Sequence, residues 1–252
     1  GRAVAIEPLN GCGHCGFCDA GHSIHCEQGF SLLGVMADGG MAEYIKVPPN
    51  KLIELPSGLD VAIASLVEPL AVAVHGVDRA QVREGDRVLV IGAGPIGLAI
   101  GAVLRGRGIA YDITARYPHQ QQAAERLGGK LRADGHYDVV MDAIGSAASL
   151  KQATARVKPM GRIGLVGMFW EPTKLEQQFW AKEAVLIPAA GYYCKSPRRS
   201  FDEARTLLHQ CPDIAEALIT HRYPLDGVTE AFHTAGNRAA GAIKVVFDIS
   251  KQ

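Results

Sequence analysis

The sequence lacks a net charge, a long uninterrupted apolar run and an apolar N-terminal segment. Its 252 residues include 26 lysines and arginines against 26 aspartates and glutamates. Without a basic excess or a basic run, the composition gives no reason to expect nucleic-acid binding. The longest apolar stretch, Val61–Val77, is interrupted by Glu68, Pro69 and His75, so we do not expect it to span a membrane. The first residues contain no apolar segment of signal-peptide length, and we therefore expect a cytoplasmic protein.

Cysteine is scarce, with six residues, but four of these fall within a short loop. Their spacing is C-x2-C-x2-C-x7-C, formed by Cys12, Cys15, Cys18 and Cys26. In a chain without a secretory signal, such clustering favours a metal site over disulfide bonds. Four thiolates can complete a tetrahedral site and leave no open coordination position. The spacing therefore predicts a structural zinc ion.

Two other chemistries use clustered cysteines. A ferredoxin-type iron–sulfur run has a shorter last gap and a proline after its last cysteine, whereas Glu27 follows Cys26 here. A redox C-x-x-C pair would not need four cysteines. Three histidines in the same loop are expected to be solvated rather than metal-bound, because four thiolates already complete the site: His14, His22 and His25.

The pattern of residues along the chain changes twice. Residues 1 to about 60 form a loop-heavy region with short β-like runs at Arg2–Ile6 and Ala42–Val47, and residues 216–252 return to such runs. The middle alternates strand-like and helix-like segments, which predicts parallel βαβ units in a doubly wound sheet. The expected strands are Arg87–Ile91, Ala110–Ala115, Asp138–Ala143, Arg162–Val166 and Ala184–Ala190, and the expected helices are Pro118–Leu127, Ala147–Val157 and Phe201–His209.

A glycine motif, Gly92–Gly97 (GAGPIG), follows the first of these strands and opens a helix. In this context G-x-G-x-x-G indicates dinucleotide binding rather than an ordinary glycine-rich turn. Gly92 permits the tight turn, Gly94 lets the backbone approach the pyrophosphate, and Gly97 lets the helix pack closely on the strand. Pro95 fits the first helical turn, and the amides that follow, from Ile96 on, can bind phosphate.

The end of the second expected strand indicates which cofactor is bound. An enzyme that uses NAD usually has an acid there, about twenty residues after the glycines, to bind the ribose 2′-hydroxyl. This sequence has Thr114–Tyr117 (TARY) instead. Arg116 can pair with a 2′-phosphate in a charge-assisted contact, which favours NADP. The alternatives are a solvated surface arginine and NAD as the cofactor.

The cysteine loop followed by the glycine motif resembles the zinc-containing medium-chain alcohol dehydrogenases. Gly39–Tyr44 (GGMAEY) is similar to the family's GGFAEY turn, and Leu66–Leu70 (LVEPL) resembles the EPL segment of the sorbitol and butanediol dehydrogenase branch. Lys244 matches the basic residue of the closing strand. The match runs over essentially the whole chain. Zinc-independent quinone and enoyl reductases of the same superfamily fit poorly, because they generally lack the four-cysteine lobe.

The resemblance implies a fold and an assembly. Residues 1–74 and 216–252 would form part of a β-rich, GroES-like catalytic domain with the zinc lobe. Residues 75–215 would form the inserted Rossmann domain. Family members are homodimers or homotetramers, often joined through the last Rossmann strand, here near Val185–Gly191.

The resemblance also assigns roles to particular residues. Glu68 matches a glutamate at the catalytic zinc, where zinc would act as a Lewis acid on a secondary alcohol, diol or polyol. A glutamate at the start of a helix that faces solvent is the alternative. Val166 and Gly167 would lie near the nicotinamide, and Lys244 would contact the cofactor. Phe169 and Trp170 would wall the substrate pocket or pack without a role.

This sequence departs from the family pattern in two places. Upstream of the segment resembling Gly1–Pro8, family members carry a catalytic cysteine, a Gly-His-Glu motif and a proton-relay hydroxyl, and this chain has none of them. Glu68 alone cannot hold a catalytic zinc, which needs three protein ligands. The alternative function is therefore a catalytically incomplete, cofactor-binding fragment that holds structural zinc only. The segment Lys130–His136 is short, and the usual third Rossmann strand is expected to be missing.

Overall fold

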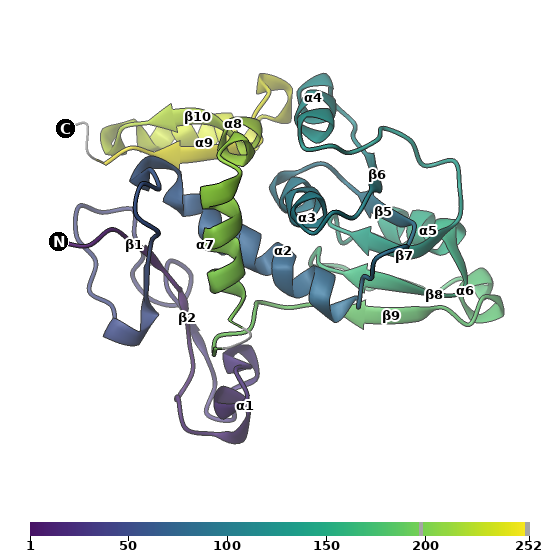
Figure 1. The fold of residues 1–252 in the computed structure, drawn as a ribbon, viewed down its shortest axis with the longest axis horizontal. Coiled ribbons are helices and arrows are strands. Elements are labelled where there is room, and N and C mark those ends of the chain that lie inside the picture. Colours follow the sequence, from purple (N-terminus) through teal and green to yellow (C-terminus); the bar gives the residue numbers. More distant parts are fainter. Residues whose placement is uncertain (197–198, 250–252) are drawn as a thin grey trace. The chain divides into compact units, whose positions relative to one another are not determined.

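The computed structural model describes residues 1–196 and 199–249, which form two compact units (Figure 1). Unit 1 combines Gly1–Ala71 with Gly191–Gln252, and unit 2 is Val72–Ala190. The second boundary lies before the helices α7 (Ser200–Gln210) and α8 (Asp213–Leu218), which the alternating pattern had placed in the Rossmann domain. Tertiary contacts decide this difference, because α7 and the residue before it bind side chains and carbonyls of the N-terminal segment.

Unit 2 is built around a parallel sheet with the strand order β6-β5-β7-β8-β9. The chain enters this sheet at β5, crosses to the edge strand β6, and returns to β7 on the other side of β5. Apolar runs such as VLVI in β5, all of it buried, fit strands that are covered on both faces. This is the expected doubly wound fold. Its elements are β5 (Val88–Ile91), α3 (Pro95–Gly106), β6 (Tyr111–Thr114), α4 (Pro118–Arg126), β7 (Tyr137–Asp142), α5 (Ala147–Arg156), β8 (Val157–Leu165), α6 (Gln177–Ala181) and β9 (Val185–Pro188).

The third Rossmann strand is reduced to a single parallel bridge between Asp112 and Lys130. The Ile113 amide donates to the Lys130 carbonyl (2.9 Å), and the Lys130 amide donates to the Tyr111 carbonyl (3.1 Å). The chain therefore follows the outer side of β6 for one residue before it turns towards β7. Because a third strand would lie at the edge of the sheet, its loss leaves the pairing of β5, β6 and β7 intact.

Unit 1 consists of small sheets, short helices and loops. β1 pairs with β4 and β2 with β3, both antiparallel, while β10 and β11 are parallel. No described strand pairs with the expected β-like run Ala42–Val47, which forms no strand, since isolated β-like runs need a hydrogen-bonded partner. The elements are β1 (Val4–Ile6), β2 (Leu9–Asn10), α1 (Gly16–Asp19), β3 (Ser31–Leu32), β4 (Leu52–Glu54), α7, α8, β10 (Ile219–Tyr223), α9 (Val228–Gly236) and β11 (Lys244–Phe247).

A continuous helical stretch, Val61–Arg79, ends in α2 (Val67–Arg79). Among the described residues it is the one helix whose length and hydropathy would allow it to cross a membrane. Within its most apolar window, 67% is buried inside the fold. Leu66, Val67, Leu70 and Ala71 are fully buried, so this part of the stretch is packed in the core.

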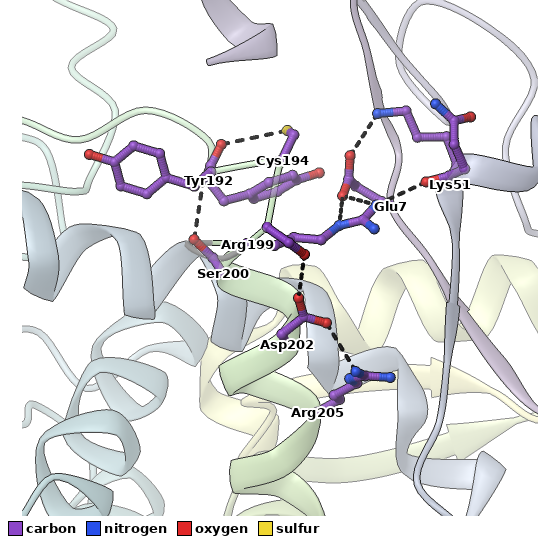
Figure 2. Close-up of polar contacts among 11 residues, drawn as sticks. Glu7, Lys51, Tyr192, Cys194, Arg199, Ser200, Asp202 and Arg205 are labelled. Atoms are coloured by element: carbon purple, nitrogen blue, oxygen red, sulfur yellow. Dashed lines mark hydrogen bonds and ion pairs between the residues drawn. The ribbon is translucent and has the colours of Figure 1, made fainter. Parts of the chain in front are cut away.

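A buried ion cluster joins distant parts of the chain in unit 1 (Figure 2). The Glu7 side chain is 0% exposed, and its two oxygens bind different cations. Lys51 Nζ lies 2.6 Å from Oε1, and Arg199 binds Oε2 through Nε (2.8 Å) and Nη2 (2.7 Å). Arg199 also donates to the Asn50 carbonyl (2.9 Å). Together with the bond from Arg205 to the Glu54 carbonyl, this cluster anchors the start of α7 to the N-terminal segment.

We expect Glu7→Gln to lower the free energy of unfolding of unit 1 by about 3 kcal/mol, because removing one partner leaves a buried charge uncompensated. The matched control is Glu54→Gln, which breaks the exposed ion pair between Arg2 and Glu54. Exposed pairs contribute about 0–1 kcal/mol, so this control should change little. Urea unfolding measures both variants. Equal effects would mean that the cluster does not stabilise this unit.

Candidate functional site

The four cysteines of the expected zinc site come together in one lobe of unit 1. Their sulfur atoms all lie within 4.8 Å of one another, and the Sγ atoms of Cys15 and Cys26 are 4.0 Å apart. Four thiolates around a tetrahedral zinc at 2.3 Å would be about 3.8 Å apart, so the residues present fit the ion. Among the described residues they form the one group of three or more Cys, His, Asp or Glu side chains that could hold a metal.

The backbone of the lobe favours thiolates at two of these positions. Amides of Cys18 and Glu27 lower the pKa of Cys15 to about 6, and the Cys12 amide, 3.2 Å from Cys26 Sγ, lowers the pKa of Cys26. Burial and the neighbouring thiols raise the pKa of Cys18 to about 11. Four thiolates this close together repel one another unless a cation lies between them. The lobe is therefore arranged for a metal ion rather than for four free thiols.

The glycine motif forms the turn between β5 and α3 in unit 2. Gly92 adopts a φ of 97°, a region that favours glycine, and its amide donates to the Thr114 hydroxyl (3.0 Å). A Cβ on Gly97 would overlap the Gly92 carbonyl oxygen, so only glycine allows this close packing. Gly94 has no neighbour within 4 Å of an added Cβ, and Pro95 begins α3. The open backbone and the helix start fit a dinucleotide pyrophosphate.

The adenosine side of this site lies at the end of β6. Arg116 follows that strand by two residues and is exposed. Its guanidinium lies over the Tyr117 ring, 5.5 Å from the ring centre. Tyr117 in turn stacks with His119 in the first turn of α4, at 5.6 Å and 12°. The arginine is thus exposed, which both of its interpretations allow.

The other side of the site lies at the ends of β7 and β8. The amides of Val166 and Gly167 donate to the Asp142 carbonyl at 3.0 and 2.9 Å. This brings the turn after β8 against the turn formed by Ala143–Gly145 after β7. A Cβ on Gly92 would also meet the Ile144 side chain, at 2.6 Å. The turns after β5, β7 and β8 therefore meet at the carboxyl edge of the sheet, at the switch point between β5 and β7.

A cavity of about 440 Å³ lies beside these turns. It is lined by Gly145–Ala148 at the start of α5 and by Trp170–Thr173 after β8. Trp170 is 82% exposed, whereas Phe169 is half-buried. Phe169 is thus partly packed, whereas most of the Trp170 side chain is exposed.

Glu68 lies in the first turn of α2, in unit 1. It is half-buried and lines an apolar cavity of about 370 Å³ together with Val4–Ile6, Pro8, Val61, Ala64 and Ser65. Burial raises the pKa of Glu68, and the positive charge of Lys244 opposes this rise. The pKa of Lys244 is lowered by burial and raised by Glu68. The structure thus brings Lys244, which the resemblance assigned to the cofactor, close to the predicted catalytic carboxylate.

Within residues 1–196 and 199–249, no set of three metal ligands includes Glu68. His75, in the same helix, is 5% exposed and is buried in the fold. A catalytic zinc needs three protein ligands, so these residues do not by themselves hold one. A role for Glu68 at a catalytic zinc therefore stays a prediction.

Sequence reasoning missed two residues of the dinucleotide site. Thr114 accepts the Gly92 amide, and Asp142 binds the turn that follows its own strand. The signal for Asp142 was present, because an acid within an apolar strand must find donors if it is buried. Thr114 carried no such signal, since threonine is common in strands.

Comparisons with known proteins agree with both units. The family described as alcohol dehydrogenase GroES-like domain matches residues 1–57, and the family described as glucose dehydrogenase C-terminus matches residues 61–249. A sorbitol dehydrogenase from Halalkalibacterium halodurans is 28% identical over 265 residues, which is 97% of this chain and 75% of that protein.

Two solved structures share the fold and contain cofactors. The alcohol dehydrogenase rspB from Escherichia coli CFT073, complexed with NADH, has a TM-score of 0.86 and 28% identity over 97% of this chain and 76% of its own. A zinc-binding dehydrogenase from Sinorhizobium meliloti 1021, bound to NADP, has a TM-score of 0.84 and 27% identity over 98% of this chain and 77% of its own. The chain belongs to the zinc-containing medium-chain alcohol dehydrogenases and is an oxidoreductase that uses zinc and a nicotinamide cofactor.

Proposed function

We propose that this protein oxidises a secondary alcohol, diol or polyol with NADP and reduces the corresponding ketone in the reverse direction. The observation that carries the proposal is Glu68, a half-buried carboxylate beside a basic residue at the wall of an apolar cavity. The sequence relative that acts on sorbitol supports a polyhydroxylated substrate. The nicotinamide would accept the hydride, and the turns after β5, β7 and β8 would hold it.

The test is NADP reduction with a panel of diols and polyols, run beside a direct measurement of cofactor binding. We expect turnover in the wild-type protein and its loss in Glu68→Gln, with cofactor binding unchanged. Turnover that persists in Glu68→Gln would remove Glu68 from the reaction.

A second candidate is a cofactor-binding chain that holds structural zinc and does not turn over. In the part of the chain that the structure describes, Glu68 belongs to no group of three metal ligands. Cofactor binding together with no turnover on any diol or polyol would support this candidate over the first.

For the cofactor, we expect Arg116→Asp to lower the ratio of NADPH affinity to NADH affinity by about 10- to 100-fold. The reason is that hydrogen bonds to charged groups contribute about 1.5–3 kcal/mol, and an aspartate would repel the 2′-phosphate. Arg83→Asp is the matched control, since Arg83 is also exposed but precedes β5 at the opposite edge of the sheet. Fluorescence titration with both cofactors gives the ratio. An unchanged ratio in Arg116→Asp would mean that Arg116 does not select NADP.

We also propose a cytoplasmic homodimer or homotetramer that acts on a small-molecule substrate. β9 is an edge strand of the unit 2 sheet, and Val185 at its start is 50% exposed. Pairing of two β9 edges would cover the unpaired backbone groups of this strand. Light scattering on the purified protein tests the assembly.

A further inference from the structure

A buried carboxylate lies beneath the turn that follows β7 in unit 2. Asp142 is 0% exposed. Its Oδ1 accepts the amides of Ile144 (2.9 Å) and Gly145 (3.1 Å), and its Oδ2 accepts the Ser149 hydroxyl (2.8 Å). One side chain therefore binds both the turn and the first turn of α5.

The same residue also holds the neighbouring turn through its backbone. Its carbonyl accepts the amides of Val166 and Gly167, at 3.0 and 2.9 Å. The two turns approach so closely that a Cβ on Gly145 would overlap the backbone of Gly167 and Met168. Asp142 is thus the shared acceptor for two turns that have no room to shift independently.

These turns lie on one side of the cofactor site only. In a doubly wound sheet a dinucleotide lies across the switch point, with its pyrophosphate at the first strand-to-helix turn. The order β6-β5-β7-β8-β9 places Arg116 and the adenosine half at β6. The nicotinamide half then falls on the turns after β7 and β8.

We infer that Asp142 is a positioning residue that fixes these two turns as the floor of the nicotinamide half-site. This inference rests on the proposed function. Burial raises the pKa of Asp142, and the amides and the Ser149 hydroxyl oppose that rise. Its donors are all neutral, so the residue organises backbone rather than pairing with a cation.

The inference predicts that loss of the Asp142 carboxylate changes the affinities for two ligands differently. NADPH occupies both halves of the site, whereas 2′,5′-ADP occupies only the adenosine half. We expect Asp142→Asn to weaken NADPH binding by about tenfold or more, because an amide nitrogen cannot accept the Ser149 hydroxyl and the turn loses a charged acceptor. Binding of 2′,5′-ADP should stay within about twofold of wild type. Ser149→Ala removes the hydroxyl that donates to Asp142 and accepts the Ser146 amide, but it leaves the turn amides bound to Asp142. It should change NADPH binding in the same direction but less.

The matched control is Asp112→Asn. Asp112 is also buried in unit 2, at 6% exposure, but it binds Tyr137 and Arg132 towards the amino edge of the sheet. Its loss should reduce stability and leave both ligands bound as before. Equal weakening of NADPH and 2′,5′-ADP in Asp142→Asn, or no weakening of NADPH, would overturn the inference.

Failure of the proposed function gives different results: a chain without turnover can still bind both ligands, and a chain without an NADP site binds neither. Amide hydrogen exchange then tests Asp142 directly. Faster exchange confined to the turns after β7 and β8 in Asp142→Asn would support the positioning role. Unchanged exchange there would overturn it.

Discussion

Cys15→Ser should abolish stoichiometric zinc binding and destabilise the cysteine lobe. The wild-type lobe is expected to hold about one zinc per chain. Structural zinc contributes roughly 10–16 kcal/mol to folding, so loss of even a quarter of that, about 3 kcal/mol, would unfold the lobe at moderate temperature. Serine does not supply an anionic ligand near neutral pH, whereas backbone amides lower the pKa of Cys15 to about 6. Elemental analysis and thermal melting measure the two effects.

The matched control is Cys211→Ser. Cys211 is half-buried and lies outside the group of four, so zinc content and melting should follow the wild type. Retained zinc with an unchanged melting profile in Cys15→Ser would contradict the assignment. Iron in place of zinc would favour the iron–sulfur alternative. Near two zinc ions per wild-type chain would mean that further ligands complete a catalytic site.

The second large effect is expected at the glycine motif. Substitution of one of its glycines should lower stability, whereas substitution of another should weaken cofactor binding. Gly97→Ala places a Cβ against the Gly92 carbonyl and 3.4 Å from Ala143 Cβ, so it should destabilise unit 2 by about 1–3 kcal/mol. Gly94→Ala meets no atom within 4 Å and should leave stability unchanged. It should nevertheless weaken NADPH binding by about tenfold or more, because the backbone can no longer approach the pyrophosphate.

Urea unfolding and NADPH titration of both variants separate the fold from the site. Gly236→Ala in α9 is the control, since a Cβ there also meets no atom within 4 Å. It should change neither measurement. If Gly94→Ala bound NADPH like the wild type, the motif would be an ordinary glycine-rich turn.

Much of unit 2 could be predicted because local sequence determines it. Each expected strand overlaps an observed one, from Arg87–Ile91 with β5 to Ala184–Ala190 with β9. Apolar runs in a parallel sheet are buried on both faces, and this makes them visible without tertiary information. The run Ala42–Val47 shows the limit, since β propensity without a partner strand forms no strand.

Local patterns were also sufficient for the cysteine lobe and the glycine turn. Both consist of residues close in sequence, and their spacing carries the geometry of a tetrahedral metal or of a phosphate-binding turn. Glu68 and Lys244 are different, because more than half of the chain separates them. The resemblance assigned them separate roles, and the structure shows that each charge acts on the pKa of the other.

By itself the sequence determined the metal lobe, the dinucleotide turn and the order of strands and helices, since short-range geometry decides each of these. Tertiary structure decided that α7 belongs with the N-terminal segment, through Arg199 and the buried Glu7. It also decided that Asp142 binds two separate turns. Such contacts join residues far apart in the chain, and whether a polar side chain is buried with its partners depends on how the whole unit packs.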